Sequence, residues 1–252
     1  MSIRCITFDL DNTLWPIKPI ILGAEKAVKA FIESNFSDYS QAFIFEELVK
    51  SRQSILTAHP ELKVKLTALR TKVYYDSLQK LGVADKTATS IAQQAVEIFL
   101  MHRNKVQLFE GVESALAELS SHYVLGAITN GNVRFQQLSI AKYFSFYLSA
   151  ENVGVAKPDK KIFDRAIEQA QRAQNEISSP KQILHVGDDL HYDIYGANQA
   201  GLLSCWIPFG DETQKAYNDN GDSETNNNDK KKPDITIRHL NELLEAVKSY
   251  KL

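Results

Sequence analysis

The sequence predicts an α/β protein in which a doubly wound parallel sheet carries an all-helical domain inserted after its first strand. Two patterns predict this fold class. From about residue 109 onward, short apolar runs without polar alternation, typical of strands buried on both faces, alternate with helix-spaced apolar residues. Between the first such run and that point, from about residue 22 to 101, apolar residues recur at helical spacing with little glycine.

The elements follow in order along the chain. The first strand is expected at residues 3–8, where an apolar run ends abruptly in Asp9 and Asp11. Residues 17–106 are expected to form the helical insert, with four or five helices and Gly82 as a C-cap. The core domain, residues 1–16 and 107–252, is expected to hold the remaining elements. Its helices are expected near residues 112–119, before residue 146, at 159–173, near 194–200 and at 240–247. Its further strands are expected at residues 124–128, 146–148, 183–186, 204–207 and 233–237.

Residues 211–233 interrupt the alternation of strands and helices. From Asn218 to Lys232 the chain is rich in Asn, Asp and Lys and has almost no apolar residues. Such a segment cannot bury enough apolar surface to order itself, so we expect a mobile surface loop. The lysine run at residues 230–232 is interpreted as its solvated end.

Composition limits the class of protein. The 252 residues are 44% hydrophobic and carry a formal net charge of −2, so no basic excess points to nucleic acid or to an anionic membrane. The two cysteines, Cys5 and Cys205, lie in apolar runs and are expected to be buried free thiols. No signal-peptide pattern or membrane-length apolar stretch occurs, so we expect a cytoplasmic protein, either a monomer or a weak homodimer.

Polar side chains gather where the predicted strands end. The carboxyl ends of parallel strands meet at one edge of the sheet, which is where ligands bind in such folds. Asp9 and Asp11 follow the first strand, and Thr129-Asn130-Gly131 ends the next one. Lys157-Pro158 precedes a helix, and Gly187-Asp188-Asp189, with Asp193 beyond it, ends a later strand.

These residue types match the needs of phosphoryl transfer. Two neighbouring carboxylates repel each other, and a divalent cation is the usual reason that a fold keeps both. A carboxylate can act as the nucleophile, and a second acid can protonate the leaving oxygen and then deprotonate water. A hydroxyl and backbone N–H groups can hold phosphate oxygens, while a lysine offsets the accumulated negative charge. The expected cofactor is Mg²⁺, which prefers oxygen ligands.

Four motifs in this order resemble the haloacid dehalogenase superfamily. They are Asp-x-Asp-x-Thr from Asp9, Thr-Asn-Gly from Thr129, Lys-Pro from Lys157 and Gly-Asp-x-x-x-x-Asp from Gly187. Each alone is weak, but all four stand in the family order at a predicted strand or helix end. The resemblance covers nearly the whole chain. It implies a Rossmann-like core with a small helical cap, and a Mg²⁺-dependent phosphatase that acts on a small phosphorylated metabolite through an aspartyl-phosphate.

The resemblance also implies a role for each motif residue. Asp9 would be the nucleophile and a metal ligand. Asp11 would be the general acid and base, with its backbone carbonyl on the metal. Thr129 and the amide of Asn130 would bind the transferring phosphate. Lys157 would neutralise charge and orient Asp9.

Three acids at the fourth motif complete the implied site. Asp188 would ligate Mg²⁺ directly. Asp193 would act close to the metal, either through water or by holding Lys157. Asp189 is not assigned a role, because the family accepts other residues at that position.

A closer resemblance is to the YigB-type bacterial phosphatases. This branch is associated with 5-amino-6-(5-phospho-D-ribitylamino)uracil, a phosphate of riboflavin synthesis, and with FMN. Another nucleotide or sugar phosphate is the alternative substrate, and a phosphomutase or a dehalogenase of the same superfamily is the alternative activity. The segments that carry this closer resemblance are residues 8–14, 18–22, 127–132, 185–190 and 205–207.

Other functions fit the pattern less well. A dehalogenase needs neither an acid for an oxygen leaving group nor a metal, so Asp11 and Asp188 argue against it. A signalling receiver domain is rejected, because its phosphorylated Asp ends a middle strand and its Lys follows the Thr near the domain end. A catalytically dead interaction protein stays open, although the intact acids and Lys157 argue against it.

Several further residues have open interpretations. Lys160 and Lys161 are rivals of Lys157, and the position of Lys157 before Pro158 favours it. His185 is interpreted as a core residue of its strand, and Trp15 either packs the hinge or stacks on a substrate ring. The remaining candidates could face the substrate or be solvated; they are Arg52, Arg70, His102 and Arg103.

Overall fold

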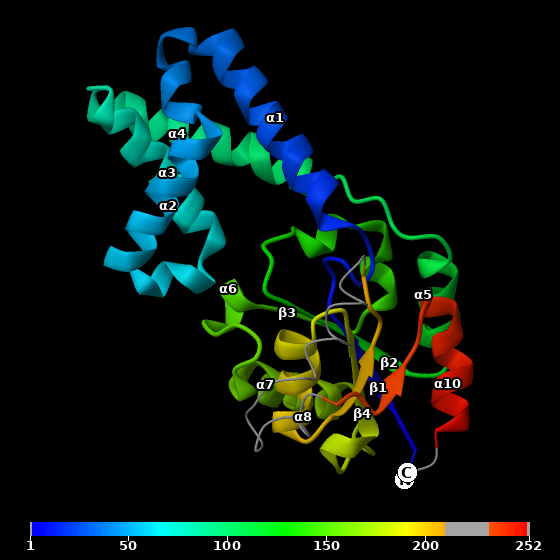
Figure 1. Ribbon diagram of the computed structural model, residues 1–252. Coiled ribbons are helices and arrows are strands. Elements are labelled where there is room, and N and C mark those ends of the chain that lie inside the picture. The colour runs from blue at the N-terminus through cyan, green and yellow to red at the C-terminus, as the bar shows by residue number, and fades with distance from the viewer. Residues whose placement is uncertain (1, 210–231, 251–252) are drawn as a thin grey trace, which may run out of the picture. The chain divides into compact units, whose positions relative to one another are not determined.

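The structure, a computed structural model, describes residues 2–209 and 232–250 and divides into two compact units (Figure 1). The first, here called the α/β unit, comprises Met1–Pro16, Gln107–Gly131 and Ser139–Leu252. The second, here called the helical unit, comprises Ile17–Val106 and Asn132–Leu138. The last of these segments was expected in the core domain, and the structure groups it with the helices instead. The expected mobile loop at residues 211–233 lies outside the described residues, apart from its last two positions.

The α/β unit is built on six parallel strands in the order β3-β2-β1-β4-β5-β6. Every side chain of β1, β4 and β5 is buried, as expected for strands covered on both faces. The predicted fold class, a doubly wound parallel sheet with a helical insertion, is confirmed. The strands span Cys5–Phe8 (β1), Val124–Thr129 (β2), Phe146–Ser149 (β3), Ile183–Gly187 (β4), Leu203–Trp206 (β5) and Ile235–Thr236 (β6).

Helices lie on both faces of this sheet (Figure 1). On one side, α5 (Val112–Ser120) and α10 (Leu243–Ser249) lie next to each other. On the other, α7 (Lys160–Ala173) packs against α8 (Gly196–Ala200) and buries its apolar side chains in a core shared with the strands. A one-turn helix, α6 (Ala150–Val153), follows β3 directly.

The connection between β2 and β3 differs from the expectation. It contains two 3-10 helices, η3 (Phe135–Gln137) and η4 (Ser139–Tyr143), so the prediction of an α-helix there is wrong. The buried residues Phe135, Leu138 and Ile140 are spaced three and then two positions apart, and such spacing does not continue one face of an α-helix.

In the helical unit, residues 17–106 are described throughout and form four α-helices with two 3-10 helices between them. Their apolar faces share one core that includes Val28, Leu69 and Phe99. Gly82 has a φ of 75° just beyond α3 and donates its N–H to the carbonyl of Gln79 at 2.9 Å, the arrangement expected of a glycine that ends a helix. The helices span Ile17–Asn35 (α1), Ser37–Phe43 (η1), Phe45–Ala58 (α2), Pro60–Val64 (η2), Leu66–Lys80 (α3) and Asp85–Arg103 (α4).

Polar contacts hold residues 132–138 to the helices of this unit. Asn132 Nδ2 donates to Thr67 Oγ1 at 3.2 Å. The backbone N–H of Arg134 donates to Asn104 Oδ1 at 2.7 Å, and its guanidinium pairs with Glu97 at 2.5 Å. These contacts explain why a segment that follows β2 belongs to the helical unit.

The remaining expectations concern membrane spans, the role of the helical unit, location and oligomeric state. No helix within residues 2–209 and 232–250 has both the length and the apolar character needed to cross a bilayer. The cap role of the helical unit, the cytoplasmic location and the oligomeric state stay predictions.

Candidate active site

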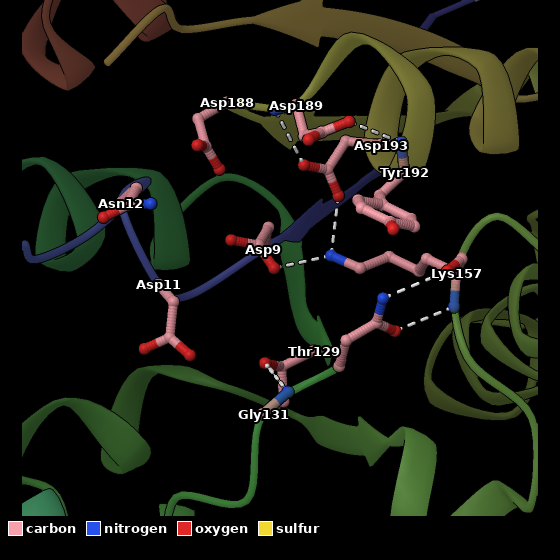
Figure 2. A pocket seen from close by; sticks show the side chains of 11 residues that line it. Asp9, Asp11, Asn12, Thr129, Gly131, Lys157, Asp188, Asp189, Tyr192 and Asp193 are labelled. Atoms are coloured by element: carbon pink, nitrogen blue, oxygen red, sulfur yellow. Dashed lines mark hydrogen bonds and ion pairs between the residues drawn. The ribbon is translucent and has the colours of Figure 1, made fainter. Parts of the chain in front are cut away.

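A polar pocket lies at the carboxyl edge of the sheet, within the α/β unit (Figure 2). The strand order reverses between β1 and β4, and in a doubly wound sheet ligands bind beyond the carboxyl ends of the strands at that point. All seven residues predicted for the site line this pocket, together with four others. The lining residues are Asp9, Asp11, Asn12, Thr129, Asn130, Gly131, Lys157, Asp188, Asp189, Tyr192 and Asp193.

Asp9 is held at the end of β1. Its backbone N–H donates to the carbonyl of Val186 on the neighbouring strand at 2.8 Å, which continues the pairing of β1 with β4. Its side chain accepts from Lys157 Nζ at 2.5 Å and from Thr13 Oγ1 at 3.2 Å. Burial, together with the charges of neighbouring acids, raises the pKa of Asp9 to about 7 although Lys157 opposes this. The carboxylate is therefore well positioned but surrounded by excess negative charge.

Lys157 is a buried cation between two acids. Its Nζ donates to Asp9 Oδ1 at 2.5 Å, to Asp193 Oδ1 at 2.6 Å and to the carbonyl of Ile128 at 2.9 Å. Burial alone would lower the pKa of Lys157, but the two carboxylates outweigh it and raise that pKa above its ordinary value. The side chain is therefore charged at neutral pH. Of the rival lysines, Lys160 is exposed and pairs with Asp164 instead.

The loop that carries Lys157 is fastened to the end of β2. Asn130 Oδ1 accepts the backbone N–H of Lys157 at 2.8 Å, and Asn130 Nδ2 donates to the carbonyl of Lys157 at 3.0 Å. Next to it, Thr129 Oγ1 accepts the N–H of Gly131 at 2.9 Å, which leaves the Thr129 hydroxyl proton for another acceptor. The Asn130 side chain therefore fixes the position of Lys157, a contact that the sequence did not predict.

Asp193 links Lys157 to a buried histidine. His185 Nε2 lies 3.1 Å from Asp193 Oδ1, and His185 Nδ1 lies 2.9 Å from Thr7 Oγ1. Because burial lowers the pKa of His185, the ring is neutral; its Nε2–H donates to the carboxylate and its Nδ1 accepts from Thr7. Burial would raise the pKa of Asp193, but Lys157 and His185 outweigh it and hold that pKa well below its ordinary range. Asp193 is therefore an ionised partner of Lys157.

Gly187 allows the close approach of Asp193. A Cβ atom at position 187 would lie 2.3 Å from Asp193 Cγ, which is closer than any real contact. A side chain at the end of β4 would therefore collide with Asp193, which explains why glycine occupies position 187. The sequence placed it in a motif without revealing that reason.

Asp188 adds a third acid to the cluster. It accepts from Thr13 Oγ1 at 3.3 Å, and the same hydroxyl also faces Asp9, so its single proton can satisfy only one of the two at a time. Burial, followed by the charges of Asp9 and Asp193, raises the pKa of Asp188 to about 8. One carboxylate oxygen from each of these three acids lies within 4.8 Å of the others. The cluster could hold a metal ion, and its all-oxygen donor set fits Mg²⁺.

Asp189 has a different task from its neighbour. Its Oδ1 accepts the backbone N–H groups of His191 and Tyr192, each at 2.7 Å, and so caps the π-helical turn at Leu190–Tyr195. Its own N–H donates to Asp193 Oδ2 at 3.1 Å. Asp189 therefore shapes the loop after β4.

Asp11 lines the pocket from a tight turn after β1 (Figure 2). Asn12 has a φ of 63°, a conformation that Asn adopts more readily than most residues, and its N–H donates to the carbonyl of Trp15 at 2.7 Å. Trp15 Nε1 donates to Asp11 Oδ1 at 2.8 Å. The Trp15 side chain is completely buried, which favours packing over stacking on a substrate ring.

The four other candidates belong to the helical unit. Arg70 pairs with Glu25 at 2.5 Å, and Arg103 is buried at the end of α4. His102, on the same helix, lies 3.4 Å from Lys105 Nζ, and Arg52 is exposed on α2. None of these four is among the residues that line the described pocket.

Several residues in or next to the pocket received no catalytic or binding role from sequence reasoning. Thr13 stands in the first motif, so its position was a signal that could have been used. His185 and Thr7 face each other on paired strands, β4 and β1, a contact that only the register reveals. Tyr192, 45% exposed, lines the pocket beside Asp193 and had no signal other than that neighbour.

Comparison with known proteins adds family information to this geometry. A family model described as a haloacid dehalogenase-like hydrolase matches residues 3–201. The chain is 32% identical over 205 residues to the 5-amino-6-(5-phospho-D-ribitylamino)uracil phosphatase YigB of Escherichia coli (strain K12), covering 81% of this chain and 83% of that protein. It is 29% identical over 254 residues to the glyceraldehyde 3-phosphate phosphatase of Methanopyrus kandleri, covering 98% of this chain and 97% of that protein.

A solved structure matches the chain over nearly its full length. It is the crystal structure of a 2-haloacid dehalogenase from Pseudomonas syringae pv. Tomato DC3000, with a TM-score of 0.83 and 33% identity. The match covers 98% of this chain and 99% of that one. The chain is thus similar both to proteins named as phosphatases and to a protein named as a dehalogenase.

Proposed function

The chain belongs to the haloacid dehalogenase-like hydrolase family and is a hydrolase of phosphate esters, and from this premise we propose that it is a Mg²⁺-dependent phosphatase of a small phosphorylated metabolite. The observation that carries the proposal is the buried lysine between two acids. Lys157 Nζ lies 2.5 Å from Asp9 and 2.6 Å from Asp193, beside the third acid, Asp188. Such a centre combines a nucleophile with the positive charge that a phosphoryl group requires.

In the first step, a carboxylate oxygen of Asp9 attacks phosphorus. The new bond joins that oxygen to phosphorus, while the bond from phosphorus to the substrate alcohol breaks. Asp11 donates a proton to the leaving oxygen. Lys157 remains on Asp9 and offsets the negative charge of the transferred group, and the Thr129 hydroxyl with the Asn130 amide binds its oxygens.

In the second step, water replaces the alcohol. Asp11, now a carboxylate, takes a proton from the water, whose oxygen attacks phosphorus. The bond between phosphorus and Asp9 breaks, and inorganic phosphate leaves. Both steps therefore use the same acid–base residue in opposite directions.

Mg²⁺ would be held by the carboxylates of Asp9 and Asp188 and by the backbone carbonyl of Asp11. When bound, it would neutralise the acidic cluster and polarise a phosphate oxygen. Both Asp193 oxygens already accept hydrogen bonds, Oδ1 from Lys157 and His185 and Oδ2 from Asp189. We therefore assign Asp193 to holding Lys157, the second of the two roles expected for it, with any metal contact made through water.

The relatives supply the substrate class. The E. coli relative is named for 5-amino-6-(5-phospho-D-ribitylamino)uracil and the Methanopyrus relative for glyceraldehyde 3-phosphate, both small phosphorylated metabolites. We propose the first compound or FMN as substrate, with another nucleotide or sugar phosphate as the alternative. The helical unit would act as the cap that selects it.

A dehalogenase is the second candidate, because the neighbour with 33% identity carries that name. Its chemistry also begins with an aspartate nucleophile, but a halide leaves without needing a proton. Asp11 and the acid Asp188 would then have no task. Halide release from a 2-haloacid, with no phosphate release from any ester, would favour this candidate.

The test is phosphate release from a panel of metabolites with and without Mg²⁺. The panel includes FMN, 5-amino-6-(5-phospho-D-ribitylamino)uracil, nucleoside monophosphates, sugar phosphates and an aryl phosphate. Asp9→Asn, a nearly isosteric change, is the matched blank. We expect Mg²⁺-dependent release that disappears in the variant, with preference for the flavin-related compounds. Stability of every ester, the aryl phosphate included, would contradict the proposal.

A further inference from the structure

Both tryptophans of the chain donate their indole N–H to an acid of the site. Trp15 Nε1 donates to the carboxylate oxygen Oδ1 of Asp11 at 2.8 Å, and Trp206 Nε1 donates to the backbone carbonyl of Asp188, also at 2.8 Å. The acceptors differ in kind. Trp206 fixes a main chain, whereas Trp15 contacts the group that would transfer the proton.

The indole of Trp15 is held by its own turn. Within this turn, the Asn12 N–H donates to the Trp15 carbonyl at 2.7 Å and the Leu14 N–H donates to the Leu10 carbonyl at 2.8 Å. The Trp15 side chain is 0% exposed, so the surrounding core fixes its orientation, while Asp11 is only partly buried. The buried indole therefore fixes the position of the Asp11 carboxylate oxygen that it binds.

We propose that Trp15 is a positioning residue that holds Asp11 Oδ1 and so directs Oδ2, the proton-transferring oxygen, toward the reacting phosphate. This inference rests on the proposed function. An indole N–H can only donate, and the unprotonated oxygen of a carboxyl group is its better acceptor, so this contact favours the transferable proton on the oxygen that Trp15 does not bind. The proton is left to the other oxygen of the same carboxyl group.

The two steps of the reaction then use one atom. Oδ2 of protonated Asp11 gives its proton to the leaving alcohol oxygen as the bond to phosphorus breaks. The same Oδ2 takes a proton from water as the water oxygen bonds to phosphorus. The Trp15 N–H stays on Oδ1 throughout, so the carboxyl group does not need to rotate between the steps.

The test compares two leaving groups that share a ring. Phenol leaves poorly without a proton, because its pKa is about 10, like that of the tyrosine side chain. Dinitrophenol is far more acidic and leaves as an anion. We measure kcat/KM for phenyl phosphate and for 2,4-dinitrophenyl phosphate in wild type and in Trp15→Phe, which keeps a buried aromatic ring but lacks the N–H. The parameter kcat/KM includes only the steps up to departure of the first product.

We expect Trp15→Phe to lower kcat/KM for phenyl phosphate by about 10-fold or more and that for the dinitrophenyl ester by less than about 3-fold. In Trp15→Phe, dinitrophenol should also be released in a burst. The second step, hydrolysis of the phosphorylated Asp9, still needs Asp11 and becomes slower than the first. An equal loss with both esters means that Trp15 only supports the fold, and it would overturn the inference. If neither ester is hydrolysed by wild type, the proposed function itself fails.

Trp206→Phe is the matched control, because it removes the same group from the other tryptophan. It should change both esters by the same factor, since its partner is the carbonyl of Asp188 and not the acid. If Trp15→Phe does not fold, replacement of Trp15 by 3-benzothienylalanine keeps the ring shape and removes the N–H. The same change in the ester ratio is expected there, and an unchanged ratio contradicts the inference.

Discussion

Each unit of the protein contains a cation paired with an acid, buried for Lys157 and partly buried for Arg70, and the two cations have different surroundings. In the α/β unit, Lys157 contacts Asp9 at 2.5 Å and Asp193 at 2.6 Å, and Asp188 belongs to the same cluster. Three carboxylates thus surround one lysine. Burial, together with the charges of neighbouring acids, raises the pKa values of Asp9 and Asp188 to about 7 and about 8.

In the helical unit, the positive charge of Arg70 is balanced by one carboxylate. It donates to Glu25 at 2.5 Å and to the Tyr74 hydroxyl at 3.0 Å, and its guanidinium lies 3.4 Å from the centre of the Phe99 ring. One acid balances one base, and the aromatic ring covers the exposed face of the cation. This arrangement is satisfied without any ligand.

The comparison separates a reactive cluster from a structural one. Both clusters are ion-paired and hydrogen-bonded, so an ion pair alone does not identify a site. The unbalanced charge around Lys157 requires a metal ion or a proton, whereas the pair at Arg70 requires neither. Substitutions at the two clusters should therefore have different effects, on activity at Lys157 and on stability at Arg70.

Lys157→Met should remove most of the activity. The neutral side chain fills a similar volume but leaves Asp9 and Asp193 facing each other without a cation, and nothing offsets the transferred phosphoryl charge. We expect kcat to fall by about 100- to 1,000-fold at saturating Mg²⁺. Phosphate release measures it, and circular dichroism checks the fold. Activity within 10-fold of wild type would mean that Lys157 is not part of the reactive cluster.

Arg70→Met should affect stability and not chemistry. Glu25 loses its partly buried partner, so we expect the unfolding free energy of the helical unit to fall by about 1–2 kcal/mol, while activity per folded molecule stays within about two-fold. Urea denaturation and phosphate release measure the two quantities. Adding Glu25→Leu should recover part of the lost stability, because the unpaired acid is then removed. A large loss of kcat in the folded variant would make Arg70 a functional residue.

The pH dependence of stability should differ between wild type and Asp188→Asn. Burial, followed by the charges of Asp9 and Asp193, raises the pKa of Asp188 from 3.8 to about 8. The metal-free folded protein therefore keeps a proton between about pH 4 and 8 that the unfolded chain releases, so stability falls as pH rises through this window. The asparagine variant lacks this proton. Between about pH 5 and 8, wild type should lose at least about 1 kcal/mol more than the variant.

Thermal and urea denaturation in a chelating buffer measure that difference. Mg²⁺ binds the deprotonated acids, so its stabilising effect on wild type should grow with pH over the same window and be weak in Asp188→Asn. Parallel pH profiles for the two proteins would show that Asp188 carries no shifted proton.

Thr7→Val should have the smallest effect. It removes the hydroxyl that donates to His185 Nδ1 at 2.9 Å but keeps the shape of the side chain. His185 still donates to Asp193, so Lys157 stays in place. We expect a loss of about 1 kcal/mol in stability and a kcat within about three-fold of wild type. A loss of kcat as large as that of Lys157→Met would show that the chain from Thr7 to Asp193 controls the lysine directly.

The fold could be predicted in most of its parts because buried parallel strands have a simple signature. Short runs at residues 5–8 and 183–187 that are apolar except for Thr7 and His185 can be recognised as buried strands from the sequence alone. The family resemblance from the four motifs, including that to the YigB-type phosphatases, is confirmed by the comparisons. The prediction of an α-helix between β2 and β3 was wrong. It extended the alternation of strands and helices to residues whose apolar spacing does not form one face of an α-helix.

The sequence indicated which side chains line the pocket. It did not indicate which hydrogen bonds hold them in place. Asp9, Lys157 and Asp188 stand at strand or helix ends, so the topology brings them together. The contact of Asn130 with the backbone of Lys157 and that of Trp15 with Asp11 depend on loop conformation, which the sequence pattern does not encode. The helical unit has no parallel strands whose carboxyl ends would mark a binding site. The sequence therefore predicted no definite role for its residues.

The most direct test of the central claim is the identity of the phosphorylated residue. Wild-type protein is mixed with Mg²⁺ and a substrate labelled in its phosphoryl group, quenched within one turnover in acid and mapped by peptide analysis. We expect the label on the carboxylate of Asp9 and no labelled protein with Asp9→Asn. Label on another residue, or phosphate release from Asp9→Asn at the wild-type rate, would contradict the reactive cluster described here.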